Sequence, residues 1–72
     1  MSNIYSSEYK KITRRLKQSR VEVGFTQKQV AEKLDKLQSY VSKSESGERR
    51  LDVTELKKFA ELYKKDINFF IK

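Results

Sequence analysis

The chain has 72 residues, near the lower limit for a domain that buries its own core, so its length predicts one domain over residues 1–72. It contains no cysteine and no histidine, which excludes disulfides, zinc fingers and other cofactor or metal sites built on those ligands. Seventeen Lys and Arg against ten Asp and Glu give a formal net charge of +7, which favours a polyanionic partner such as nucleic acid.

A first helix is predicted over residues 7–23, because apolar side chains recur there at helical spacing. Residues 1–6 before it are expected to be flexible. Gly24 supplies the left-handed backbone that ends a helix at low cost, and Phe25 follows as an expected core anchor. The apolar side of this helix is formed by Tyr5, Tyr9, Ile12, Leu16 and Val23.

A second, shorter helix is predicted to start at Thr26 and to last about two and a half turns. Thr26 and Gln29 form a capping-box pattern, in which each side chain satisfies a backbone N–H that the start of a helix leaves unpaired. Residues 35–37 then break the pattern, and Asp35 tolerates the left-handed backbone of a tight turn. The buried stripe of this helix is expected to be Val30, Ala31 and Leu34.

A third helix is predicted over residues 38–45, directly after that turn. Only Tyr40, Val41 and the preceding Leu37 are apolar in this stretch, so most of the helix surface has no core to face. So little apolar surface on a short helix indicates that its exposed side serves a function, such as binding a ligand.

A fourth helix is predicted to begin after Asp52, where Asp52 and Glu55 repeat the capping box, and to run to about Tyr63. Residues 67–71 then predict a short fifth helix that closes the core. With no competing strand pattern, the fold class is all-α, a compact five-helix bundle. The inner stripe of the fourth helix is expected to be Leu56, Phe59, Ala60 and Tyr63, with Val53 and Leu62 beside it.

The apolar chain end is also a candidate dimer surface, formed by Ile67, Phe69 and Phe70. Phe69 and Phe70 are adjacent and therefore point in different directions on a helix, which suits one side chain facing inward and one facing a partner. Closing the core and binding a second copy are compatible roles for this segment.

A short helix, a three-residue turn and a second short helix with a polar outer face make residues 26–46 a helix-turn-helix, whose second helix fits the DNA major groove. The linked segments RVEVGFTQ (20–27), VAEKL (30–34), QSYVSK (38–43) and ESG (45–47) closely resemble the Cro/repressor (XRE) helix-turn-helix family. The resemblance covers residues 9–71. It implies a lambda-repressor-like DNA-binding domain that acts as a homodimer on a two-fold operator.

Two residues depart from the family pattern. Asp35 stands where glycine is common in the turn, and Ser44 occupies a site usually filled by a larger apolar residue. The Ser44 hydroxyl is expected to bond the carbonyl four residues earlier, which would satisfy it inside the core. We expect reduced stability from this position and no change of fold.

Four residues of the third helix are candidate base readers, and Gln38 leads them because glutamine can bond adenine N6 and N7 together. The alternative for Gln38 is an ordinary exposed glutamine. Serine can bond several base edges or simply permit close approach, and lysine suits guanine O6 and N7 or a phosphate. The other three candidates are Ser39, Ser42 and Lys43.

Four further residues are candidate phosphate contacts, each with a structural alternative. Gln27 resembles the phosphate-contacting glutamine of the family, and its alternative role is capping. Tyr40 offers a hydroxyl to a phosphate or serves only as a packed ring. Arg49 and Arg50 lie where the family's loop follows the DNA backbone, with solvated loop charges as the alternative.

Arg20 and Glu45 match an Arg and a Glu that pair in many members of the family and tie the first helix to the end of the third. We interpret them as a structural ion pair. Loss of DNA binding in a variant of either residue would therefore not prove contact, because stranding one buried charge costs about 3–5 kcal/mol.

Other functional classes are disfavoured by the sequence. An enzyme would need a Gly-rich phosphate loop, a nucleophile with its base, or a metal-ligand cluster, and the chain has none. A basic membrane-binding helix is weakened by the acidic Glu8 and Glu22, no apolar run approaches the about 20 residues of a spanning helix, and no secretory leader pattern opens the chain.

We therefore expect a cytoplasmic transcriptional regulator, a repressor that binds double-stranded DNA as a homodimer without cofactor, small-molecule ligand or membrane. The alternative is an antitoxin or protein-interaction module with the same fold, whose protein partner would cover one face.

Overall fold

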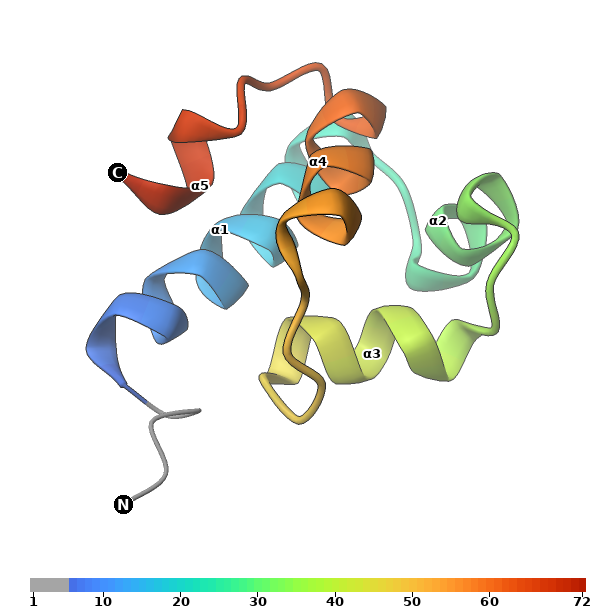
Figure 1. Ribbon diagram of the computed structural model, residues 1–72. Helices are drawn as coiled ribbons and strands as arrows, with labels where there is room; N and C mark the ends of the chain where they lie inside the picture. Colours follow the sequence, from blue (N-terminus) through green and yellow to red (C-terminus); the bar gives the residue numbers. More distant parts are fainter. Residues whose placement is uncertain (1–5) are drawn as a thin grey trace.

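The computed structural model describes residues 6–72, and five helices account for most of them. Tyr5 and the rest of the expected flexible start lie outside the described residues, except for Ser6. Residues 6–72 contain no strand, so the all-α class with five helices is confirmed. The helices drawn in Figure 1 are α1 (Ser7–Val23), α2 (Gln27–Leu34), α3 (Gln38–Ser46), α4 (Val53–Leu62) and α5 (Asn68–Ile71).

Helix α1 begins and ends as its sequence predicts. The Ser6 hydroxyl accepts a hydrogen bond from the Tyr9 backbone N–H at 3.2 Å and so caps the first turn. At the other end Gly24 takes a left-handed backbone, with φ 84°, and its N–H bonds the Arg20 and Val21 carbonyls.

The two predicted capping boxes are both present. At the start of α2, the Gln29 N–H donates to Thr26 Oγ1 at 3.1 Å while the Thr26 N–H donates to Gln29 Oε1 at 2.8 Å. At the start of α4, Asp52 and Glu55 exchange the equivalent bonds at 2.7 and 3.0 Å. Each box fixes where its helix starts, because both side chains satisfy N–H groups that no helical carbonyl can reach.

Every helix contributes at least one fully buried apolar side chain to a common core. Each such side chain contributes about 1.5–3 kcal/mol by leaving water. Helices of eight and nine residues, such as α2 and α3, are only marginally stable on their own. Packing of their few core residues therefore stabilises them more than their own backbone hydrogen bonds do. Among residues 6–72, the five apolar side chains with no exposed surface are Leu16, Val30, Val41, Phe59 and Phe70, one from each helix in order.

Val23, expected on the apolar side of the first helix, and Val53, expected beside the inner stripe of the fourth, both lie at the surface. Val23 is 42% exposed, because the chain turns away at Gly24 and Ser19 is the last α1 side chain that the core encloses. Val53 is 72% exposed at the first turn of α4, whose inward face starts only at Leu56.

The candidate dimer surface at the chain end needs correction. Phe70 has no exposed surface, so the expectation that it lines a dimer surface is wrong: its ring lies in the core, at 88° to the Phe69 ring. Phe69 is half-buried, and the cations of Arg15 and Lys65 lie 5.4 and 4.5 Å from its ring centroid. The exposed apolar side chain of α5 is Ile71, at 50%.

Helix α5 is bound to α1 by two long side chains. Arg15 Nη1 donates to the Phe69 carbonyl at 2.6 Å, and Lys11 Nζ donates to the Lys72 carbonyl at 2.7 Å. These bonds satisfy carbonyls that a four-residue helix leaves unpaired at its end.

Helix α3 runs along one edge of the bundle, with α2 beside its amino end and α5 on the far side (Figure 1). The radius of gyration is 11.3 Å, close to the about 11 Å expected for a compact chain of this length. Within residues 6–72, no helix combines the length and the apolar character that crossing a bilayer requires.

Candidate nucleic-acid interface

The turn between α2 and α3 consists of three residues, 35–37. Asp35 adopts the predicted left-handed backbone, with φ 58°, and Lys36 N–H reaches back to the Ala31 carbonyl at 2.8 Å. These bonds end α2 and redirect the chain within one residue. Helices α2 and α3 then pack closely against each other and form the helix-turn-helix unit.

Helix α3 has a buried side and an exposed side. Val41 and Ser44 have no exposed surface, Tyr40 is half-buried, and only 4% of the Glu45 side chain is exposed. The side chains on the opposite side make no hydrogen bond or ion pair with any described residue, which leaves them available to a ligand. These exposed residues, which we call the α3 outer row, are Gln38, Ser39, Ser42 and Lys43.

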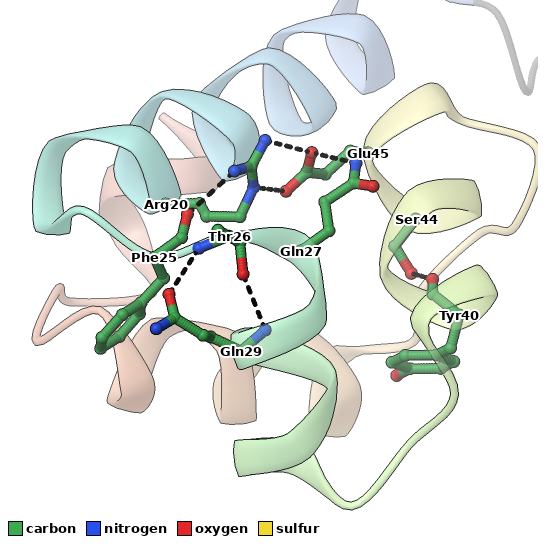
Figure 2. Close-up of polar contacts among 8 residues, drawn as sticks. All are labelled: Arg20, Phe25, Thr26, Gln27, Gln29, Tyr40, Ser44 and Glu45. Carbon is green, nitrogen blue, oxygen red and sulfur yellow. Dashed lines mark hydrogen bonds and ion pairs between the residues drawn. The ribbon is translucent and has the colours of Figure 1, made fainter.

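Ser44 is accommodated in the core as the sequence predicts. Its hydroxyl donates to the Tyr40 carbonyl, one turn earlier, at 2.7 Å (Figure 2). The hydroxyl is therefore satisfied although the residue is completely buried, and no water is needed to hold it.

Arg20 connects three segments of the fold, as Figure 2 shows. Its Nε and Nη2 bond the two carboxylate oxygens of Glu45 at 2.7 and 3.2 Å, while Nη1 donates to the Phe25 carbonyl at 2.9 Å. The hydrogen bond to Glu45 raises the pKa of Arg20 above its ordinary value. The Arg20 side chain is 12% exposed and that of Glu45 is 4% exposed. Away from solvent, the pair therefore joins three segments: α1, α3 and the loop that precedes α2.

Gln27 belongs to the same cluster. Its Nε2 donates to Glu45 Oε1 at 3.1 Å, which ties the first turn of α2 to the end of α3. Capping of α2 is done by Thr26 and Gln29, so the side chain of Gln27 does not play the capping role considered for it. The Arg20–Glu45–Gln27 cluster fixes the orientation of α3 relative to α1 and α2.

Arg49 and Tyr40 are both held by Glu55, a residue of α4. Arg49 Nη2 lies 2.6 Å from Glu55 Oε2, and the Tyr40 hydroxyl donates to the same oxygen at 3.3 Å. The Arg49 guanidinium also lies 4.8 Å from the centroid of the Tyr40 ring. A phosphate that recruited Arg49 would therefore compete with the Glu55 carboxylate.

Two pKa shifts follow from this cluster. The Asp52 backbone N–H, and after it Arg49, lowers the pKa of Glu55, so the carboxylate stays charged at neutral pH. Burial, with a contribution from Glu55, raises the pKa of Tyr40, which keeps its hydroxyl protonated and able to donate.

Tyr9 positions the loop between α3 and α4, and nothing in the motif spacing pointed to it. Its hydroxyl accepts from the Leu51 N–H at 2.9 Å and donates to the Arg49 carbonyl at 3.4 Å. The guanidinium of Arg50 lies 4.3 Å from the centroid of the Tyr9 ring. A tyrosine near the start of α1 thus fixes the backbone of the loop that carries both arginines.

The described part of the chain holds no group of three or more His, Cys, Asp or Glu side chains that could bind a metal ion. The polar groups that the helix-turn-helix offers to a ligand are hydrogen-bond donors and acceptors on α3 and cationic side chains beside it.

Comparison with known proteins identifies the family. A family model described as helix-turn-helix matches residues 16–70, a slightly shorter range than the 9–71 over which the sequence motifs show the resemblance. Searches of curated proteins and of solved structures return no significant match. Because the family match covers well over half of the chain and coincides with the observed α2–turn–α3 unit, the chain belongs to the Cro/repressor (XRE) type of helix-turn-helix proteins, a family of DNA-binding regulatory domains and not of catalytic ones.

Proposed function

We propose that this protein is a sequence-specific transcriptional regulator that binds double-stranded DNA as a homodimer on a two-fold operator. The observation that carries the proposal is the asymmetry of α3: its inner side is fastened to the core, while the side chains of the α3 outer row make no hydrogen bond or ion pair with the described residues. An exposed polar row on a rigidly held helix is what reading base edges in the major groove requires.

Base reading is assigned to the α3 outer row. Gln38 lies at the amino end of α3, the end that helix-turn-helix proteins place deepest in the groove, where its amide can bond adenine N6 and N7. Ser39, Ser42 and Lys43 follow on the same exposed side, and Lys43 suits guanine or a nearby phosphate.

Phosphate contacts are assigned to residues around this row. Arg49 and Arg50 lie in the loop after α3, and the net charge of +7 supplies general attraction to the DNA backbone. Gln27 and Tyr40 lie at the amino ends of α2 and α3, where unpaired backbone N–H groups also favour a phosphate. Their bonds to Glu45 and Glu55 hold the side chains in place before DNA arrives.

Repression is the regulatory outcome that we propose, because a dimer bound over a promoter excludes polymerase from the DNA that it covers. In a two-fold complex the two α3 helices would lie about 34 Å apart, one turn of DNA, and would read the two half-sites of the operator.

The experiment that tests the proposal is selection of bound sequences from a pool of random duplexes. We expect one enriched motif with two-fold symmetry. An enriched motif without that symmetry would contradict the homodimer, and a pool that shows no enrichment would contradict sequence-specific binding altogether.

Gln38→Ala tests the assignment of base reading. This variant should lose preference at one or two base pairs of each half-site, a loss of about 1–3 kcal/mol of discrimination. Gln18→Ala, which removes an exposed glutamine of α1, is the matched control and should select the wild-type motif. If folded Gln38→Ala selects the same motif with the same stringency, Gln38 does not read bases.

A further inference from the structure

Leu37 occupies an unusual position at the tip of the helix-turn-helix. It is the last residue of the turn and the N-cap of α3, and 77% of its surface is exposed. The other large apolar side chains at the surface of the described residues are less exposed, Val53 at 72% and Val21 at 60% among them. The sequence predicts Leu37 as an apolar part of α3, yet it belongs neither to the core cluster nor to the partly buried side chains packed against that cluster.

Leucine at this position also fails to cap the helix. The N-caps of α1, α2 and α4 are Ser6, Thr26 and Asp52, and each accepts a backbone N–H through a side-chain oxygen. Leu37 has the same extended backbone, with φ −75° and ψ 154°, but no side-chain bond to offer. A serine, threonine or aspartate there would be worth about 1 kcal/mol. Neither packing nor capping explains a leucine here.

The setting of Leu37 favours DNA over an apolar protein surface as its partner. Its neighbours in the chain are the cationic Lys36 and the polar Gln38, both exposed, and the α3 outer row continues from it. An apolar partner needs a contiguous apolar patch. A DNA groove instead presents single apolar groups, the C5 methyls of thymines, among phosphates and polar base edges.

We infer that Leu37 is a specificity-determining residue that reads thymine by packing its side chain on the C5 methyl group in the major groove. The inference rests on the proposed function, because it requires the amino end of α3 to enter the groove. Leu37 then adds apolar recognition of a base pair beside the one that Gln38 contacts. Cytosine, which lacks the methyl group, is disfavoured at that position.

The test uses the duplex obtained by selection, with each thymine replaced singly by deoxyuridine. This change removes only the methyl group and leaves base pairing and the O4 acceptor intact. We expect wild-type binding to weaken about fourfold at one or two positions of each half-site, the effect of exposing one buried methyl group. Other thymines should tolerate the replacement.

Leu37→Ser provides a variant that does not lose the fold, because serine supplies the missing cap of α3. It should bind thymine and deoxyuridine duplexes equally at the sensitive positions. Val53→Ala, which shortens a different highly exposed apolar side chain, is the matched control and should keep the fourfold difference.

Three results would overturn the inference: a selected motif without thymine, wild-type binding that ignores every deoxyuridine replacement, or a methyl preference that survives in Leu37→Ser. In each case sequence-specific binding itself would stand. A pool that yields no motif for the wild-type protein would instead refute the proposed function, so the two failures are distinguishable.

Discussion

At the scale of single residues, two polar atoms in the core stand out. Within residues 6–72, Ser19 Oγ and the Tyr63 hydroxyl are buried without a hydrogen-bond partner. Burial, reinforced by the negative charge of Glu45 and opposed by Arg20, raises the pKa of Tyr63. Burying a hydroxyl costs desolvation free energy, and here no hydrogen bond compensates for it. Tyr63 is therefore a site where the sequence is not optimal for stability.

Replacing Tyr63 by phenylalanine should therefore leave the free energy of unfolding at pH 7 unchanged or raise it by about 1 kcal/mol. The pH dependence should also change. A raised pKa in the folded state means that wild-type stability is complete below pH about 10 and falls as pH rises further, because unfolded tyrosine ionises first. Tyr63→Phe should lack this part of the alkaline loss.

Urea unfolding at pH 7 and pH 10.5 measures both effects. Tyr9→Phe is the matched control: its hydroxyl bonds the Leu51 N–H and the Arg49 carbonyl, so this variant should lose stability at pH 7. Equal losses in the two variants would show that the Tyr63 hydroxyl has a partner after all.

At the scale of helices and loops, the sequence predicts well whatever depends on residues within one turn of each other. The capping boxes, the left-handed Asp35 and the bond from Ser44 to Tyr40 are all of this kind. Helix periods also place the core, although a period defines a direction and not where the core ends. Val23, expected on the apolar side of α1, is exposed for that reason, and so is Val53, expected beside the inner stripe of α4.

The spacing of residues along the sequence does not predict which side chains of distant segments contact each other. Nothing local indicates that Glu55 holds both Arg49 and Tyr40, or that Gln27 bonds Glu45. For adjacent aromatic residues, the sequence predicted that one faces inward without saying which, and the structure selects Phe70. The residues of the candidate site could thus be nominated from the sequence, but the bonds among them could not, apart from the Arg20–Glu45 pair that the family resemblance implied.

Glu55→Gln separates the two roles of Glu55. Glutamine can keep both bonds of the capping box but removes the charge that holds Arg49. Given the proposed function, the variant should bind every duplex about two- to fivefold more tightly, the size of an exposed ion pair, with a steeper dependence on salt.

Fluorescence titrations of specific and unrelated duplexes at several salt concentrations check this expectation. Glu61→Gln is the matched control, since it makes the same charge change on the same helix at an exposed residue that has no bond to Arg49. Equal tightening in both variants would mean that net charge alone, and not release of Arg49, governs affinity.

At the scale of the whole molecule, the proposed homodimer needs an apolar contact, and Ile71 is the exposed apolar side chain of α5. Phe69 beside it is flanked by Arg15 and Lys65 and is already half-covered. A dimer formed through this face would therefore rest on Ile71 with the half-buried Ile67, a small patch that suits association assisted by DNA.

Ile71→Lys should leave the fold intact, because the side chain is 50% exposed, while weakening binding to the two-fold site and sparing binding to an isolated half-site. Sedimentation and titration with the two duplexes measure the difference. Val21→Lys, a matched change at the surface of α1, should leave the ratio of full-site affinity to half-site affinity unchanged. A loss shared equally by half-site and full site would exclude this face as the dimer contact.

The two-sided construction of α3 separates the stability of the molecule from its choice of target. Val41, Ser44 and Glu45 fasten the helix from within, whereas no structural bond depends on the side chains of the α3 outer row. Those positions can change without disturbing the rest of the fold, so under the proposed function a few surface substitutions, whether made by evolution or by an engineer, would give this scaffold a new operator preference.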